Sequence, residues 1–123
     1  LGMQWLFSGS DESPGLAGLG VFEGRVSRLT GGVKVPHVGW NTLRRTASPP
    51  LLEGLDDNAA MYFTHSFAAP LVAGTIAVTE HGMPFTAIVE RGNVAGMQFH
   101  PEKSGTAGLR LIRNWVTACS ASA

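Results

Sequence analysis

The sequence of 123 residues contains little cysteine and no excess of charge of either sign. Its single cysteine, Cys119, cannot form a disulfide within the chain, which is typical of a reducing compartment. Nine basic and nine acidic residues balance to a formal net charge of zero, so the composition does not favour nucleic acid or an acidic membrane as a partner. No apolar run has the length of a membrane span or the flanks of a signal peptide. We therefore expect a cytoplasmic protein that binds neither nucleic acid nor membrane.

Hydrophobic residues make up 44% of the sequence, which is ample for the core of a single small domain. The chain begins with Leu1, and residues 1–7 are already apolar, as in the middle of a buried element. We therefore expect these residues to continue a longer polypeptide. No internal repeat or low-complexity segment divides residues 1–123 into two domains.

Short runs rich in β-branched and aromatic residues, bounded by glycine, proline or asparagine, predict strands along most of the chain. The strands expected are 24–29, an irregular edge strand at 33–41, 59–67, 74–79, 85–90 and 94–99. The last three follow at short intervals, which indicates a meander that ends at His100. We expect one or two helical turns in residues 1–8, a loop at 8–20 and an exposed connection at 42–54.

A helix is expected at residues 105–117, with Ser104 as its N-cap. Apolar residues recur at helical spacing within this segment, and they predict the face that packs on the core. The residues expected on that face are Leu109, Ile112, Trp115 and Val116.

His100 and Glu102 stand two residues apart where the meander is expected to end. An imidazole and a carboxylate at this spacing suit a general acid/base pair, a base for a nucleophile elsewhere, or a metal site. The metal interpretation is the weakest, because the sequence lacks the further cysteines or histidines of known zinc motifs, and we expect no metal. A histidine that only ends a strand and bonds locally is the plain structural alternative.

The other histidines give weaker signals. His65 and Ser66 are adjacent, and neighbouring side chains in a strand point to opposite faces, so they cannot act as base and nucleophile. His37 and His81 are expected to be ordinary, partly exposed histidines. Cys119 is expected to be a small packing residue at the end of the last helix. If His100 acts as a base, its nucleophile is missing from the sequence pattern.

Four stretches together resemble the class I glutamine amidotransferases, and within them the glutaminase subunit of imidazole glycerol phosphate synthase. Residues 1–4, Leu-Gly-Met-Gln, are similar to the residues directly after the nucleophilic cysteine in that family. Residues 36–41, Pro-His-Val-Gly-Trp-Asn, and 62–66, Tyr-Phe-Thr-His-Ser, are similar to segments of the subunit. The fourth stretch is residues 98–104, Gln-Phe-His-Pro-Glu-Lys-Ser, of which Phe-His-Pro-Glu alone indicates only the broader class. These stretches span nearly the whole chain in the family's order. Phe67 departs from the family's more frequent tyrosine but keeps the ring.

The resemblance implies a role for each matching residue. His100 would manage the protons for a cysteine thiolate that attacks glutamine, and Glu102 would orient its imidazole. The backbone N–H of Leu1 would help to form the oxyanion hole. The residues implied to bind the substrate are Leu1, Gln4, His65 and Ser66.

The resemblance also implies an α/β fold with a flavodoxin-like sheet and helices. Residues 1–123 would be the C-terminal portion of a single amidotransferase domain, without its N-terminal strands and without the nucleophile, which is expected just before Leu1. No cofactor is implied. The implied partner is a (β/α)₈ cyclase subunit that receives ammonia in histidine biosynthesis, docked near Trp40, Tyr62 and Lys103; ordinary surface packing is the alternative for these three. We expect the 123 residues alone to be inactive.

Two alternatives remain. The chain resembles other class I glutaminases as well, although residues 36–41 favour the histidine pathway. It also fits a non-catalytic binding module that kept the fold and lost the cysteine. The residue encoded before Leu1 separates a glutaminase from such a module.

Overall fold

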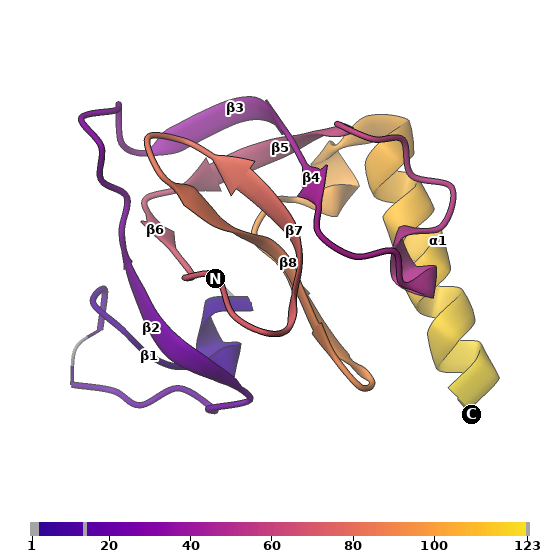
Figure 1. Cartoon of the computed structure of the whole chain (residues 1–123), viewed down its shortest axis with the longest axis horizontal. Coiled ribbons are helices and arrows are strands. Elements are labelled where there is room, and N and C mark those ends of the chain that lie inside the picture. Colours follow the sequence, from indigo (N-terminus) through magenta and orange to yellow (C-terminus); the bar gives the residue numbers. More distant parts are fainter. Residues whose placement is uncertain (1–2, 14, 123) are drawn as a thin grey trace.

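The computed structural model describes residues 3–13 and 15–122, with the backbone alone at 119–122. Short strands and 3-10 helices precede a long C-terminal helix (Figure 1). The elements in chain order are η1 (Met3–Leu6), β1 (Phe7–Ser10), β2 (Phe22–Arg28), β3 (His37–Thr42), β4 (Arg44–Arg45), η2 (Pro50–Leu52), β5 (Ala60–His65), β6 (Phe67–Ala68), β7 (Thr75–Glu80), β8 (Pro84–Arg91), β9 (Val94–Met97), η3 (Pro101–Lys103) and α1 (Gly105–Ser122).

Within the described part of the chain the strands form three sheets. The first joins β1, β2 and β6; β1 and β2 are parallel, whereas β6 is antiparallel to β2. The second is the antiparallel pair β3–β5, and the third is the antiparallel sheet β4-β7-β8-β9. The predicted meander is therefore confirmed as β7, β8 and β9, and the fold is of the expected mixed α/β class.

β8 lies at the centre of the molecule, because it is buried on both faces from Phe85 to Val89. Such a strand reads as a continuous apolar run rather than as an alternating one. Ile88 belongs to the larger core cluster, whereas Val89 packs in a second cluster around Phe7 and Phe22. The meander thus connects the two halves of the core.

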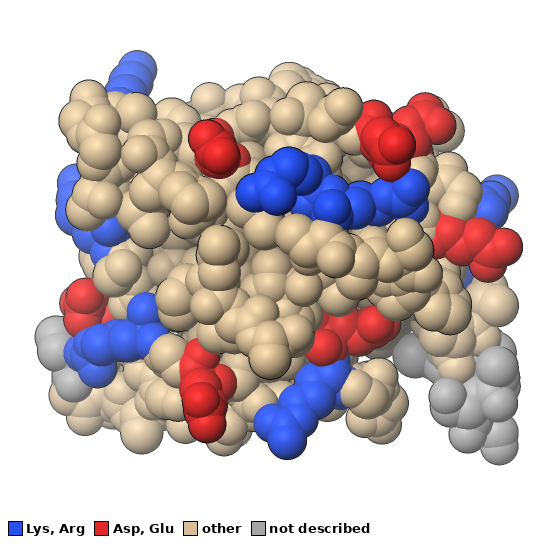
Figure 2. All heavy atoms as spheres, viewed as in Figure 1, with Lys and Arg blue, Asp and Glu red and all other residues tan. Residues whose placement is uncertain are grey.

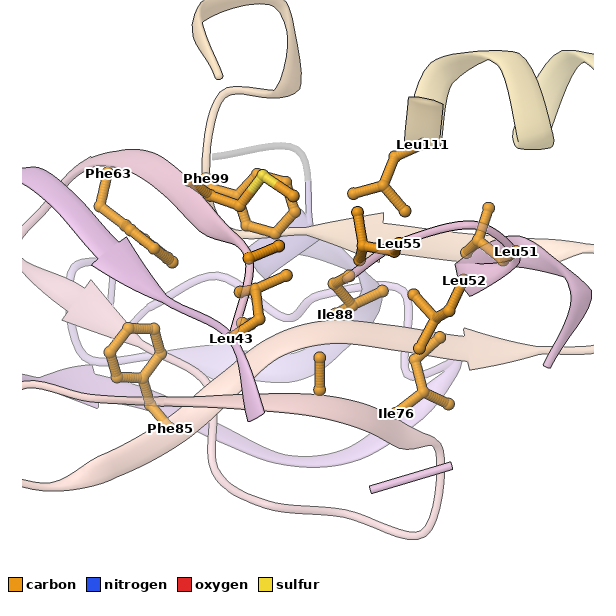
Figure 3. Packing of buried hydrophobic residues seen from close by; sticks show 14 of the residues in the cluster. Leu43, Leu51, Leu52, Leu55, Phe63, Ile76, Phe85, Ile88, Phe99 and Leu111 are labelled. Atoms are coloured by element: carbon orange, nitrogen blue, oxygen red, sulfur yellow. The ribbon is translucent and has the colours of Figure 1, made fainter. Parts of the chain in front are cut away.

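The larger core cluster fills the space between the four-stranded sheet, β5, η2 and α1 (Figure 3). In Figure 3, Leu111 reaches from α1 toward Leu55 and Ile88. Full burial of a leucine contributes roughly 2 kcal/mol by the hydrophobic effect. This cluster fixes α1, and with it the turn that precedes the helix.

The helix prediction was right in its start and wrong in its face. α1 begins at Gly105 as expected but runs to Ser122. Leu111 is fully buried. By contrast Leu109, Trp115 and Val116, assigned to the core face from the sequence, are 51%, 48% and 50% exposed. Both faces of the segment carry apolar residues, and contact with η2 and η3 selects the face that contains Leu111.

Two connections predicted from composition contain regular structure instead. The expected loop at 8–20 begins with β1, where Phe7 and Gly9 point inward and the parallel partner is β2. The expected exposed connection at 42–54 contains β4 and η2, and it buries Leu43 and Leu52 in the core. The strands β1 and β4 depend on long-range pairing with β2 and β7, which local composition does not reveal.

Acidic and basic side chains alternate over the face seen in Figure 2, in keeping with a formal net charge of zero. No patch of one sign dominates that view. Among the helices of the described residues, none is long and apolar enough to cross a membrane.

Candidate active site

His100 lies in the turn between β9 and α1. The buried ring of Phe99 anchors the chain just before it, and the His100 backbone N–H donates to the Tyr62 carbonyl on β5 at 2.9 Å. Pro101 then opens η3 with its fixed φ, which suits the first position of a short helix. The turn therefore holds the His100 backbone firmly while leaving its side chain at the surface.

The imidazole of His100 faces the carboxylate of Glu102, with Nδ1 and Oε2 3.2 Å apart. An ionised carboxylate only accepts hydrogen bonds, so the pair is satisfied when Nδ1 carries the proton. Nε2 is then left with its lone pair available to a reacting group. The side chains are 41% and 56% exposed, so both reach solvent. This is the geometry expected of a base and its orienter.

A buried hydroxyl ties this turn to β5. Ser104 Oγ donates to the His100 carbonyl at 2.6 Å and accepts from the Tyr62 N–H at 3.0 Å. The Ser104 carbonyl accepts from Gly108 N at 3.2 Å, so the residue stands at the helix start as predicted, although its hydroxyl serves the turn. A Cβ added to Gly108 would lie 2.1 Å from the Pro101 carbonyl oxygen, so only glycine allows this close approach of α1 to η3.

A depression of about 450 Å³ opens beside His100. The structure brings four of the predicted site residues to its wall, Gln4, His65, Ser66 and His100, from segments up to 96 positions apart. Leu1, the remaining residue implied to bind substrate, lies outside the described residues. The full lining is Met3, Gln4, Glu12, Thr64, His65, Ser66, Phe67, Met97, Gln98, Phe99 and His100.

Gln4 is buried and its amide is fixed by two acceptors. Nε2 donates to the Phe67 carbonyl at 3.0 Å and to Gln98 Oε1 at 3.1 Å. Gln98 comes from the end of the meander, so these bonds join the N-terminal turn to the strand that leads to His100. Gln98 opens the fourth stretch that resembles the family, but no role in the site was predicted for it from the sequence.

Two histidines lie buried behind the depression. His37 Nδ1 and His65 Nε2 are 2.9 Å apart, and the two residues are cross-strand partners on β3 and β5. The expectation of a partly exposed His37 was therefore wrong: it is 5% exposed, because its ring stacks between Phe63 and His81. His81 is partly exposed, as predicted.

Burial keeps both rings uncharged. Desolvation, with further effects from His65 and His81, lowers the pKa of His37 to about 4. Desolvation also lowers the pKa of His65, although its bond to the Phe67 carbonyl opposes the shift. Neither ring is suited to pick up a proton from solvent near neutral pH. Among the described residues, no group of three or more His, Cys, Asp or Glu side chains is arranged to hold a metal ion.

The single cysteine lies far from His100 along the helix. Cys119 is 14 residues beyond Gly105 in α1, which is about 20 Å along the axis at 1.5 Å per residue. Figure 1 shows η3 at one end of α1 and the C-terminus at the other. The structure therefore supplies an imidazole–carboxylate pair and a depression, with this thiol-bearing residue at the opposite end of the helix.

The three residues predicted at a partner interface fall near this site. Trp40 is 59% exposed and meets the ring of Tyr62 edge to face, with centroids 6.0 Å apart. Tyr62 in turn bonds to His100 and Ser104 through its backbone. Lys103 is exposed in η3, directly after the His100–Glu102 pair.

Comparison with known proteins matches residues 1–119 to the family described as glutamine amidotransferase class-I. Curated relatives named imidazole glycerol phosphate synthase subunit HisH include those of Thermococcus kodakarensis, 50% identical over 121 residues, Deinococcus radiodurans, 45% over 119, and Yersinia pseudotuberculosis, 44% over 117. Each match covers 94% of this chain and, in the same order, 62%, 55% and 60% of the relative, so the chain spans about three fifths of their length. Because the family model matches residues 1–119 of this chain, the chain belongs to the class I glutamine amidotransferases.

Proposed function

We propose that the polypeptide containing this chain is a glutaminase that supplies ammonia for imidazole glycerol phosphate synthesis in histidine biosynthesis, in the cytoplasm. The observation that carries the proposal is the His100–Glu102 pair, 3.2 Å apart, whose His100 lines a depression together with Gln4 and His65. The 44–50% identity to subunits named HisH supports this pathway over other class I amidotransferases.

In the proposed reaction Nε2 of His100 takes the proton of a cysteine thiol, and the resulting thiolate attacks the side-chain amide carbon of glutamine. The tetrahedral intermediate expels ammonia after His100 delivers a proton to the departing nitrogen, which leaves a thioester. His100 then takes a proton from water, the resulting hydroxide attacks the thioester, and glutamate departs as the thiol is restored. Glu102 keeps the proton on Nδ1 throughout, so that Nε2 performs each transfer. No cofactor takes part.

The nucleophile belongs to the proposal as well. The similarity of residues 1–4 to the sequence after the family's cysteine supports a nucleophile immediately before Leu1. Cys119 is too far away to act as the nucleophile for His100, because it lies about 20 Å along the helix from Gly105, where α1 begins after the His100 turn. Coding sequence upstream of Leu1 tests this directly. A residue other than cysteine there would favour the non-catalytic binding module.

We further propose that a (β/α)₈ cyclase docks on the face that carries Trp40, Tyr62 and Lys103. Exposed tryptophan and tyrosine are the side chains most often found to dominate interface energies. Their contact with each other, and the backbone bonds of Tyr62 to the His100 turn, would place this partner next to the point where ammonia is released. Trp40→Ala should weaken cyclase binding about tenfold or more while leaving the fold intact.

Release of glutamate and ammonia from glutamine tests the proposed activity. The polypeptide that contains these residues, mixed with the cyclase, should release equal amounts of both, and His100→Asn should abolish the release. The 123 residues alone should be inactive. Glutamine hydrolysis by the 123 residues alone, lost in His100→Ala, would contradict the upstream nucleophile.

A further inference from the structure

A chain of hydrogen bonds with a defined direction runs behind the depression. It begins at Asn41, whose Oδ1 accepts from the Thr42 N–H at 2.8 Å and whose Nδ2 donates to the Glu80 carbonyl at 2.8 Å. These two backbone groups fix which end of the amide is nitrogen. Nδ2 also lies 3.3 Å from His37 Nε2, which must therefore be the acceptor.

The donor-to-acceptor direction set at Asn41 also fixes the tautomers of both imidazoles. A neutral His37 that accepts at Nε2 carries its proton on Nδ1, which donates to His65 Nε2 at 2.9 Å. His65 then carries its proton on Nδ1, which donates to the Phe67 carbonyl at 3.0 Å. A carbonyl only accepts, so the far end of the chain requires the same tautomer as the near end. Protonation of either ring would set two donors face to face.

Ring packing prevents His37 from turning out of this chain. Its plane lies 20° from that of Phe63 and 14° from that of His81, with centroids at 4.9 and 4.1 Å. Phe85 meets the rings of both His37 and His65 edge-on. These are the groups packed around His37, and His65 and His81 are the titratable ones among them.

The chain ends at the wall of the depression. The Phe67 carbonyl accepts from His65 Nδ1 and from Gln4 Nε2, so one oxygen fixes both a histidine and a glutamine side chain. Phe67, Gln4 and His65 all line the depression, whereas His37 does not. His37 can therefore affect a bound molecule only through His65.

We propose that His37 is a positioning residue: by donating to His65 Nε2 it fixes the tautomer and ring orientation of His65, and thereby holds the Phe67 carbonyl and Gln4 amide in place for glutamine. This inference rests on the proposed glutaminase function. Without the His37 donor, His65 can adopt the other tautomer, and the lone pair of Nδ1 then faces the Phe67 carbonyl. The repulsion frees that segment from its bound position.

Steady-state kinetics of the full polypeptide with its cyclase test the inference. His37→Phe keeps the ring between Phe63 and His81 but removes the donor, and it should raise KM for glutamine about five- to tenfold, the loss expected for one neutral hydrogen bond, while kcat changes less than about twofold. His37→Asn places an amide N–H near the former Nδ1 and should restore most of the affinity. His81→Phe keeps the stacking on His37 and serves as the matched control with unchanged KM.

A second variant reverses the chain without touching the rings. Asn41→Asp has nearly the same shape and still accepts from the Thr42 N–H, but it loses the donation to the Glu80 carbonyl and presents an acceptor to His37 Nε2. It should therefore move the proton of His37 to Nε2 and raise KM as His37→Phe does. This variant preserves the buried core should His37→Phe fail to fold.

Nitrogen NMR of the imidazoles gives a readout independent of activity. Both His37 and His65 should show protonated Nδ1 and unprotonated Nε2 in the wild type, and His65 should show a mixture in His37→Phe. An Nε2–H tautomer in the wild type, or an unchanged KM in both His37→Phe and Asn41→Asp, would overturn the inference. Absence of glutamine hydrolysis in the wild type would instead overturn the proposed function, and with it the role in glutamine binding, while the tautomers would still show whether the chain has the stated direction.

Discussion

Two pairs built around histidine are joined to β5, one through the Tyr62 carbonyl and the other through His65 itself, and they differ in almost every physical respect. The side chains of His100 and Glu102 are 41% and 56% exposed and face each other across 3.2 Å. His37 and His65 are 5% and 8% exposed and face each other across 2.9 Å. The same side chain is thus used once where protons can be exchanged and once where they are fixed.

The difference teaches that surroundings, rather than residue type, decide what a histidine can do. The exposed pair has a carboxylate to stabilise an imidazolium and solvent to exchange protons with, which suits a general base. The buried pair has aromatic rings on its faces and neutral partners at its nitrogens, which disfavour charge. We therefore expect changes in the first pair to affect activity, and changes in the second to affect stability and substrate affinity.

The largest expected effect is on activity at the exposed pair. His100→Asn removes the proton carrier and should lower glutaminase kcat by about 10²- to 10⁴-fold, the usual contribution of general acid–base catalysis. Urea unfolding of the same variant should change little, because the side chain is 41% exposed. If His100→Asn kept its activity, or lost it only because the protein unfolded, the assignment of His100 to proton transfer would be contradicted.

Acid should destabilise the protein through the buried pair. The pKa of His37 is lowered to about 4 from an ordinary value of 6.5, so the unfolded chain binds more protons between these values. This contribution to the free energy of unfolding is complete above pH 6.5 and is lost as pH falls toward 4. The lowering of the pKa from 6.5 to about 4 corresponds to at most about 3–4 kcal/mol. His65 acts in the same direction because its pKa is also lowered.

Urea unfolding at pH 7, 5.5 and 4.5 measures this loss. The difference between wild type and His37→Phe isolates the contribution of His37 from that of carboxylates, which titrate in both proteins. If the free energy of unfolding changed with pH in the same way in the wild type and in His37→Phe, a neutral, buried His37 would be contradicted.

Removal of the Ser104 hydroxyl, which joins the His100 turn to β5, should have an intermediate effect on the free energy of unfolding. Ser104→Ala leaves the His100 carbonyl and the Tyr62 N–H without this partner, at an expected cost of about 1–3 kcal/mol in unfolding free energy. Ser8→Ala is the control, because Ser8 is exposed and its hydroxyl contact to a carbonyl is long at 3.5 Å. Equal thermal stability of the two variants would show that Ser104 does not hold the turn.

Removal of the charge of Glu102 should have the smallest effect on the free energy of unfolding. Glu102→Gln keeps the size of the side chain and should change the unfolding free energy by less than about 0.5 kcal/mol, because exposed ion pairs contribute little. It should nevertheless lower kcat, by less than His100→Asn does, since Glu102 acts only through the ring. A stability loss larger than that of Ser104→Ala would place Glu102 with the structural residues instead.

The local parts of the fold and site could be predicted from the sequence. The meander, the start of α1 and the placing of His100 beside Glu102 all depend on patterns within a few residues. The gathering of Gln4 and His65 around one depression was predicted from family resemblance, because nothing in their spacing brings them together.

The parts that the sequence did not reveal depend on contacts between distant segments. His37 was expected at the surface, and it is buried because β3 pairs with β5 in a register that sets it opposite His65. Leu111 rather than Leu109 faces the core, because η2 and η3 select one of two apolar faces of α1. Strand register and helix rotation of this kind are fixed by tertiary packing, which outweighs local pattern.

Covalent labelling tests the central claim most directly. A glutamine analogue that carries a diazoketone in place of the amide alkylates the thiolate that would attack the substrate. In the full polypeptide, peptide mass spectrometry should find the label on a cysteine immediately before Leu1, with labelling slowed strongly in His100→Asn. Label on Cys119, or labelling that is indifferent to His100, would contradict a glutaminase site built around the His100–Glu102 pair.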